Sequence, residues 1–301
     1  MSESQTSMSA PSHASPQRPP DPAEPPQHWA GGRWWHLWQA LTMPLFYPSF
    51  GLACVLLLAL TGYAQVRFDA APVRTRWLRQ KVQKIARIWL GWGSGLRLLR
   101  HDIDLRTELP ADGCARIVVA NHPSLVDVIF VLAEVPNVCC VLKAELGRVP
   151  VLGMLVRKLD YLSNDDPEHL LQQGSARLAA GESLLIFPEG TRTKGAKSIQ
   201  FRLGAAELAL RSKAPILPIM IHYHGRYLSG LGRWFEFPDQ QLHYTLEIGP
   251  ERPSPDADST SARRKLRRPF NRDLEDYITE RLRHGPRPVA VSAKTHWSRT
   301  P

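Results

Sequence analysis

The chain has 301 residues, a formal net charge of +10 and four cysteines. Its length allows one large domain or two small ones, and the positive surplus calls for an anionic partner, either nucleic acid or anionic lipid. The cysteines show neither metal-ligand spacing nor a disulfide framework, which argues against a disulfide-stabilised class and fits reduced thiols on the cytoplasmic side of a membrane.

Both ends of the chain are predicted to be unstructured. Residues 1–33 are rich in Ser, Pro, Gln and Ala, so they bury too little apolar surface to offset the entropy of ordering. They do not resemble a secretory signal, because a basic start and an apolar core are missing. Residues 286–301 are expected to form a second flexible tail.

The segment between Arg33 and Arg67 contains no formally charged residue. Aromatic residues gather in its first half, as in an interfacial belt: Trp34, Trp35, Trp38, Phe46 and Tyr47. With the apolar run at 51–60, the segment is long enough for the roughly twenty apolar residues that cross a bilayer core. Pro44 and Pro48 would kink or split a helix, so either a single span or a re-entrant hairpin is predicted. A buried helix of a soluble core is the alternative.

Basic residues return after this segment: Arg74, Arg76, Arg79, Lys81, Lys84, Arg87, Arg97 and Arg100. Trp77, Trp89 and Trp92 recur among them with aliphatic residues at spacings of three and four. The pattern predicts a basic amphipathic helix lying among lipid headgroups, so that residues 34–100 form a membrane-associated region. Nucleic acid would accept the arginines but leaves the preceding apolar run unexplained. Anionic membrane lipids are therefore the expected partner, and nucleic acid is not.

Residues 101–285 have the sequence pattern of an α/β domain, in which apolar strands alternate with amphipathic helices. Strands are expected at 115–120, 137–142, 183–187, 216–222 and 242–248. Helices are expected at 125–134, 167–180, 204–212 and 271–283. The predicted fold is a mixed sheet flanked by helices and preceded by the N-terminal membrane-anchoring helical segment.

Residues 121–127, which read Asn-His-Pro-Ser-Leu-Val-Asp, place an imidazole and a carboxylate between a predicted strand and a predicted helix. Pro123 suits the first turn of a helix, so His122 is expected in the loop before it. Asp127 is expected inside the first turns, with its side chain directed back toward the N-terminus. Asp127 can then hold one ring nitrogen of His122 while the other faces a substrate, as in a general-base catalyst.

A second polar turn follows the strand predicted at 183–187. A Pro-Glu-Gly turn after a buried strand exposes polar side chains at the carboxyl edge of the sheet, where ligands of open α/β sheets bind. Arg192 is a fixed cation suited to an anionic group, and Glu189 can accept hydrogen bonds from hydroxyls.

Together these motifs resemble the glycerolipid acyltransferase family, of which 1-acyl-glycerol-3-phosphate acyltransferase is typical. The first block of that family, Asn-His-x-Ser-x-x-Asp, is matched by Asn121, His122, Ser124 and Asp127, and the third, Phe-Pro-Glu-Gly-Thr-Arg, by residues 187–192. A Lys-x-Glu…Pro…Gly stretch between them is matched by Lys143, Glu145, Pro150 and Gly153, and the fourth block resembles residues 214–219. The resemblance covers roughly residues 75–250.

The resemblance implies transfer of an acyl chain from acyl-CoA or acyl carrier protein to a hydroxyl of a lipid acceptor, 1-acyl-glycerol-3-phosphate in the typical case. It implies His122 as general base, Asp127 as the group that fixes its tautomer, no acyl-enzyme, and no cofactor or metal. Ser124 is expected to make hydrogen bonds at the helix start. The substrate-binding residues carried over are Ser124, Lys143, Glu189, Gly190, Thr191 and Arg192. The expected location is the cytoplasmic face of the bacterial inner membrane.

One position departs from the family. Its second block usually carries an arginine, assigned to the acceptor phosphate, where this chain has Ser163 or Asn164. The loss of one charge-assisted contact costs about 1.5–3 kcal/mol, although Arg192 and Lys194 can still hold a phosphate. An asparagine here resembles acyltransferases that accompany aryl-polyene or related pigment-lipid pathways in Gram-negative bacteria. A phosphate-free lipid or polyene acceptor is therefore the alternative, and a catalytically silent lipid-binding protein is the rival from another class.

Two remaining patterns are interpreted as structural. His222 and His224 lie two residues apart on a predicted strand, but no third ligand accompanies them, so a structural or pocket-wall role is expected rather than a metal site. The basic run at 263–268 lacks the interleaved aromatic residues of a nucleic-acid site, so a solvated or lipid-apposed patch is expected.

Overall fold

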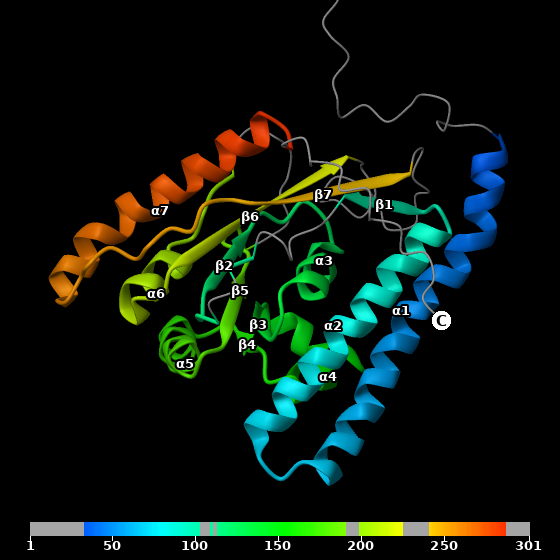
Figure 1. The fold of residues 1–301 in the computed structure, drawn as a ribbon, viewed down its shortest axis with the longest axis horizontal. Helices are drawn as coiled ribbons and strands as arrows, with labels where there is room; N and C mark the ends of the chain where they lie inside the picture. The colour runs from blue at the N-terminus through cyan, green and yellow to red at the C-terminus, as the bar shows by residue number, and fades with distance from the viewer. Residues whose placement is uncertain (1–32, 103–108, 111–112, 191–198, 225–240, 287–301) are drawn as a thin grey trace, which may run out of the picture.

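The computed structural model describes residues 33–102, 109–110, 113–190, 199–224 and 241–286. In this part of the chain a seven-stranded sheet is flanked by helices on both faces (Figure 1). The strands are β1 (Leu99–Asp102), β2 (Ile117–Ala120), β3 (Val138–Leu142), β4 (Leu162–Ser163), β5 (Ser183–Ile186), β6 (Ile216–His224) and β7 (Leu242–Ile248). The helices are α1 (Arg33–Arg67), α2 (Ala71–Gly95), α3 (Asp127–Glu134), α4 (Leu152–Lys158), α5 (Pro167–Ala179), α6 (Gly204–Ser212) and α7 (Thr260–Arg283), with a short 3-10 helix, η2 (Ala144–Arg148).

The strand order is β1-β7-β6-β2-β5-β3-β4, and the sheet is mixed, as predicted. All of its described pairings are parallel except that of β6 with β7, which is antiparallel. The carboxyl ends of β2, β3, β4, β5 and β6 therefore meet at one edge of the sheet. Because β7 runs the opposite way, its first residues lie at that same edge, where Tyr244 pairs with Tyr223.

Two apolar clusters fill the space on the opposite faces of the sheet. One cluster joins the sheet to α1, α2 and α3, and the other joins it to α5, α6 and α7. In β2, Val118 and Ala120 belong to the first cluster, whereas Ile117 and Val119 belong to the second. A strand covered on both faces is apolar at every position, which explains the unbroken Ile-Val-Val-Ala run.

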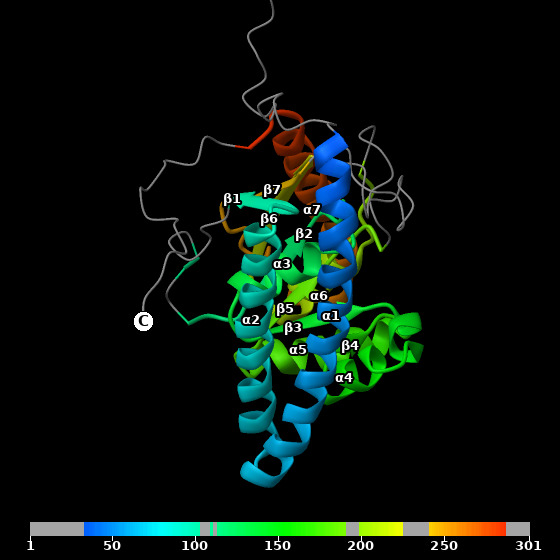
Figure 2. The same ribbon diagram turned by 90° about the vertical axis from the view of Figure 1, so that its right-hand side faces the viewer.

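The N-terminal region forms a helical hairpin in which α1 and α2 lie side by side along the sheet (Figure 2). The prediction that Pro44 and Pro48 could split the helix is wrong, because α1 is one helix of 35 residues that contains both prolines. Tertiary packing supports the helix between the prolines. The ring of Phe46 stacks on Trp89 of α2 with centroids 4.4 Å apart.

The amphipathic helix predicted after the apolar segment is present as α2, but most of its apolar side does not face lipid. Leu78, Val82 and Trp89 are buried in the cluster shared with α1 and the sheet. Arg79 is also buried and donates a hydrogen bond to Oε2 of Glu182 at 2.8 Å. Most of the apolar stripe of α2 is therefore covered by α1 and the α/β domain, and the placement of this helix among headgroups stays a prediction.

The exposed apolar surface of the hairpin lies mainly on α1. The large apolar residues of α1 with at least half of their surface exposed are Trp34, Leu37, Leu41, Leu45, Leu52, Val55, Leu56, Tyr63 and Val66, against only Val73 and Ile88 on α2. Met43, Phe46, Leu57 and Ala64 of the same helix are buried. By length and composition α1 could cross a membrane, but one of its sides is packed against protein over most of its length.

Most predicted strands and helices agree with the structure within two residues. Helix α3 begins at Asp127 rather than at 125, so Pro123 lies in the loop before it. In this loop the backbone N–H groups of Ser124 and Val126 donate to side-chain oxygens of Asp127 and Ser124. Helix α7 begins at Thr260 rather than at 271, where Ser259 caps it by accepting from the N–H of Ala262. The short elements β1, β4, η2 and α4 were not predicted. The predicted tails lie almost wholly outside the described residues.

Candidate functional site

The ring of His122 lies against the first residue of α3. Its Nδ1 is 2.9 Å from Oδ2 of Asp127, so the predicted pairing of the two side chains is present. Because Nδ1 is held by the carboxylate, Nε2 is the ring nitrogen that remains for a substrate. The side chain of His122 keeps 18% of its surface exposed, whereas that of Asp127 has none.

Asp127 is a carboxylate buried beneath the histidine. Besides His122, its oxygens accept hydrogen bonds from the backbone N–H of Ser124 at 2.7 Å and from the Ser124 hydroxyl at 2.6 Å. Burial raises the pKa of Asp127, while the bonds from His122 and Ser124 oppose that rise. These donors take the place of water around the buried charge. When ionised, Asp127 can stabilise the imidazolium that forms if Nε2 takes up a proton.

Ser124 belongs to this network and not to the substrate surface. It is fully buried, and its oxygen also accepts hydrogen bonds from the N–H of Val126 at 3.2 Å and from the Tyr244 hydroxyl at 2.9 Å. Because the side chain of Ser124 has no exposed surface, its predicted contact with substrate stays a prediction. Its predicted role as a hydrogen-bonding residue at the helix start is confirmed.

The turn after β5 meets the loop after β2. Oε1 of Glu189 accepts a hydrogen bond from the backbone N–H of His122 at 2.9 Å, and Phe187 stacks on the His122 ring with centroids 4.4 Å apart. Gly190 has a φ of +67°, which L side chains rarely adopt. A Cβ at Gly190 would also lie 2.7 Å from Nε of Arg202. The Phe-Pro-Glu-Gly block is thus packed directly beside the histidine.

Asn121 fixes the end of β2 in the sheet. Its side chain donates to the carbonyl oxygen of Ile221 at 2.9 Å and accepts from the N–H of the same residue at 2.7 Å. Since Asn121 is buried and directly precedes His122, these two bonds to β6 set the point at which the catalytic loop leaves the sheet.

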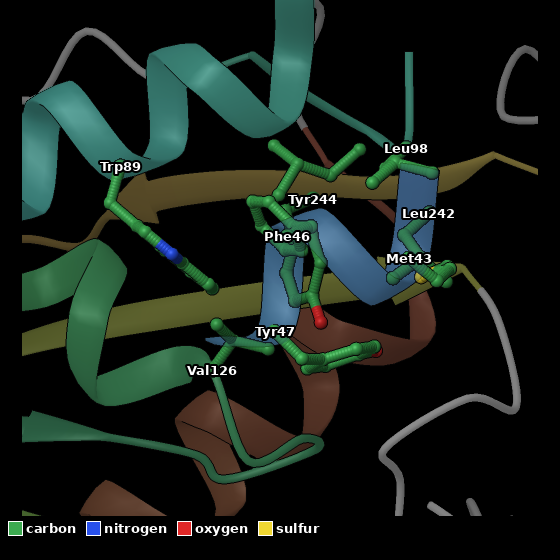
Figure 3. A pocket seen from close by; sticks show the side chains of 9 residues that line it. Met43, Phe46, Tyr47, Trp89, Leu98, Val126, Leu242 and Tyr244 are labelled. Atoms are coloured by element: carbon green, nitrogen blue, oxygen red, sulfur yellow. The ribbon is translucent and has the colours of Figure 1, made fainter. Parts of the chain in front are cut away.

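Tyr244 is a site residue that the sequence did not reveal. It is fully buried on β7 and reaches Ser124, 120 residues earlier in the chain, through its hydroxyl. Its ring also lines a small apolar cavity of about 20 Å³, together with side chains of α1, α2 and the loop before α3 (Figure 3). In the sequence Tyr244 is simply one position of an apolar strand, so no local signal marks it.

Several predicted substrate-binding residues lie apart from this network or beyond the described residues. Lys143 is exposed directly after β3, and Ser163 ends β4, so both lie at the carboxyl edge of the sheet. Thr191 and Arg192 lie outside the described residues. The sequence did not single out Arg202, an exposed cation that contacts Gly190 and therefore stands near the site.

The histidine pair on β6 does not form a described metal site. His222 is buried, with Nε2 3.4 Å from Oε2 of Glu247, which also pairs with Arg281. Within the described residues no group of three or more His, Cys, Asp or Glu side chains could hold a metal ion. The side chain of His224 lies outside the part of the chain that the structure describes.

Comparisons with known proteins agree with the motifs. An acyltransferase family model matches residues 103–222. A 1-acyl-sn-glycerol-3-phosphate acyltransferase of Helicobacter pylori is 34% identical over 36% of this chain and 49% of its own length. A protein of the same name from Pseudomonas aeruginosa is 28% identical over 66% of this chain and 77% of its own. A lyso-ornithine lipid O-acyltransferase of Brucella abortus is 29% identical over 41% of this chain and 51% of its own.

The chain thus spans about half the length of the Helicobacter and Brucella relatives. The fold is shared with a solved structure, the 1-acyl-sn-glycerophosphate acyltransferase PlsC from Thermotoga maritima. The two superpose with a TM-score of 0.61 at 19% sequence identity, over 87% of this chain and 100% of the other. At this identity the likeness concerns the fold alone.

Proposed function

Because the chain belongs to the glycerolipid acyltransferase family, we propose that it transfers an acyl chain from a thioester donor to a hydroxyl of a lipid acceptor. The observation that carries this proposal is the contact of His122 with the buried Asp127, beside the Phe-Pro-Glu-Gly turn. A catalytically silent lipid-binding protein has no chemical need for a histidine held in this way.

In the proposed reaction, Nε2 of His122 takes the proton of the acceptor hydroxyl as its oxygen attacks the thioester carbonyl carbon. The C–S bond then breaks, and the imidazolium returns the proton to the leaving thiolate. Asp127 keeps the proton of the neutral ring on Nδ1 and stabilises the imidazolium between these steps. The burial of Ser124, and its donated bond to Asp127, support a direct transfer without a serine acyl-enzyme.

We propose 1-acyl-glycerol-3-phosphate as the acceptor and acyl-CoA or acyl carrier protein as the donor. The names of the Helicobacter and Pseudomonas relatives support this acceptor. Arg202 and Lys143 are exposed cations near the site or at the same edge of the sheet, and both suit an anionic headgroup.

A phosphate-free acceptor is the second candidate. Neither Ser163 nor Asn164 supplies the cation that the family usually places after β4. The similarity to the lyso-ornithine lipid O-acyltransferase of Brucella favours this reading, since its name specifies a different acceptor lipid. The narrower aryl-polyene branch remains a prediction.

We propose that α1 lies in one leaflet at the cytoplasmic face and does not cross the bilayer. One side of α1 packs against α2, and Arg79 of α2 forms an ion pair with Glu182 of the α/β domain. If α1 crossed the bilayer, charged residues of α2 would therefore have to enter the membrane. Cysteines introduced at His36 and Gln65, in a Cys114→Ser background, test this arrangement. A membrane-impermeant thiol reagent should label both from the cytoplasmic side, whereas a spanning helix would expose them on opposite sides.

An acyl-transfer assay on the full chain in membranes tests the activity. It uses acyl-CoA and acyl carrier protein donors with lysophosphatidate and lyso-ornithine lipid as acceptors. His122→Ala should reduce turnover by at least about 100-fold, the lower range for loss of a general base. Near-normal turnover of that variant would rule out the proposed mechanism, and the preferred acceptor would decide between the two candidates.

A further inference from the structure

We infer that Tyr244 is a positioning residue of the proposed acyl transfer, acting on Asp127 through the hydroxyl of Ser124; this inference rests on the proposed function. The Tyr244 hydroxyl lies 2.9 Å from Oγ of Ser124, which lies 2.6 Å from Oδ1 of Asp127. Tyr244 comes from β7, beyond the residues that match the family model.

The Asp127 carboxylate at the end of this chain of hydrogen bonds determines which group donates in each bond. An ionised carboxylate only accepts, so the Ser124 O–H must donate to Asp127. The oxygen of Ser124 then accepts from Tyr244 and from the N–H of Val126. Burial raises the pKa of Tyr244 well above its usual value, so the phenol keeps its proton and stays a donor. Consecutive bonds that point the same way polarise and strengthen one another.

The position of the Tyr244 hydroxyl is determined by the packing of its ring. The ring lies 4.4 Å from that of Phe130 on α3 and 4.6 Å from that of Tyr223, its partner in the β6–β7 pairing. Phe46 of α1 lies on the cavity that Tyr244 also lines (Figure 3). A side chain enclosed in this way presents its hydroxyl at one place, so Ser124 is held toward Asp127.

Loss of the Tyr244 hydroxyl should leave Ser124 freer to turn from Asp127. The carboxylate would then be less well stabilised and oriented, which weakens its support of the His122 imidazolium. Neither Tyr244 nor Ser124 has exposed surface with which to touch a substrate. The effect is therefore expected in kcat and not in KM.

The test compares kcat and KM of the wild-type protein with Tyr244→Phe, Ser124→Ala and the double variant, each measured on the full chain in membranes. Tyr244→Phe should lower kcat by roughly three- to tenfold, as expected for one neutral hydrogen bond, with KM for donor and acceptor unchanged. In the Ser124→Ala background the same substitution should have no further effect on kcat. Tyr161→Phe is the control, because it removes a buried hydroxyl on another part of the fold, from a ring that lies beneath the Arg79 guanidinium.

Two results would overturn the inference. One is an unchanged kcat in Tyr244→Phe, and the other is an equal loss of kcat with and without the Ser124 hydroxyl, which would show that Tyr244 does not act through Ser124. Rates are divided by the folded fraction, obtained from thermal unfolding, so that a less stable variant still gives an answer. Near-normal turnover in His122→Ala would refute the proposed role of His122, and the absence of acyl transfer by the wild-type protein would refute the proposed function, both independently of these results.

Discussion

The Glu189 carboxylate accepts a hydrogen bond from the backbone N–H of His122, with Oε1 and N 2.9 Å apart. The bond joins the turn after β5 to the loop after β2, two strands that are neighbours in the sheet. Asp127 orients the ring of His122, whereas Glu189 fixes its backbone. Two carboxylates from two different elements therefore position one imidazole, which supplies the rigidity that a catalytic group requires.

Substitutions of Glu189 can separate its charge from its hydrogen bond. Glu189→Ala is expected to lower kcat by roughly 10- to 100-fold, because a hydrogen bond to a charged group contributes about 1.5–3 kcal/mol. Glu189→Gln keeps an acceptor oxygen for the His122 N–H and should lose much less. Acyl-transfer rates of the two purified variants measure this difference. Equal losses would mean that the charge matters and the bond to His122 does not.

Asp127→Asn is expected to lower kcat by at least about 100-fold, because an amide does not stabilise the imidazolium of His122 as a carboxylate does.

Burial raises the pKa of Asp127. Stability that arises from a raised pKa is present at low pH and is lost as the pH rises through the folded-state value. At neutral pH the ionised carboxylate thus disfavours the folded state.

The same Asp127→Asn variant should therefore unfold at an equal or higher temperature than the wild type at pH 7. Thermal unfolding in detergent measures the change in Tm alongside the loss of activity. A clear decrease in Tm would show that the hydrogen bonds of the charged carboxylate outweigh the cost of its burial.

The part of the site that could be predicted is the part that is local in the sequence. His122, Ser124 and Asp127 lie within six residues, so the short loop that leads into α3 brings them together. The contact of Glu189 with His122 spans 67 residues and depends on β2 and β5 being neighbours, an order that strand patterns do not specify. Tyr244 depends in addition on the register of β6 with β7.

The hairpin shows a second limit of sequence patterns. The spacing of Leu78, Val82 and Trp89 correctly predicted an amphipathic helix, but periodicity identifies an apolar face and not what covers it. The same stripe serves equally well against lipid or against a protein core. Arg79 could not be recognised as buried, because its partner Glu182 lies 103 residues later.

Glu182 links α2 to the sheet, and its substitution should change how the stability of the protein depends on pH. Its Oε2 accepts hydrogen bonds from Arg79 at 2.8 Å and from Arg177 at 3.1 Å. Burial alone would raise the pKa of Glu182, but the bonds and charges of the two arginines lower it overall. A lowered pKa contributes stability above the unfolded value of about 4.3, and this stability is lost as the pH falls through the folded value.

Glu182→Gln is therefore expected to lower Tm at pH 7, with the gap from the wild type narrowing below about pH 4. Thermal unfolding of both proteins across this range tests the prediction. Glu168→Gln is the control, because its carboxylate is exposed and pairs with Arg211 at the surface, where ion pairs contribute little. A gap that is constant with pH would contradict the assigned role of the Glu182 charge.

The exposed side of α1 is expected to carry membrane binding. Leu41 and Leu52 are 70% and 69% exposed, and burial of each in lipid contributes about 1.5–3 kcal/mol. Leu41→Asp combined with Leu52→Asp should strongly reduce flotation of the protein with anionic vesicles while leaving Tm nearly unchanged. His36→Asp with Gln65→Asp adds the same charges at exposed polar positions of α1 and should have a much smaller effect. Undiminished flotation of the leucine variant would place membrane binding elsewhere.

The identity of the acceptor can be tested at Asn164, which directly follows β4 and donates its N–H to the carbonyl oxygen of Leu142 at 3.0 Å. If the native acceptor lacks a phosphate, Asn164→Arg should raise kcat/KM for lysophosphatidate by roughly tenfold or more, the effect of one charge-assisted contact. If lysophosphatidate is native, its phosphate already has cations, and little gain is expected. Asp165→Arg, one residue further on and exposed, controls for general attraction of the anion. An equal gain from both arginines would therefore reflect net charge, and only a gain confined to position 164 would indicate a headgroup bound beside β4.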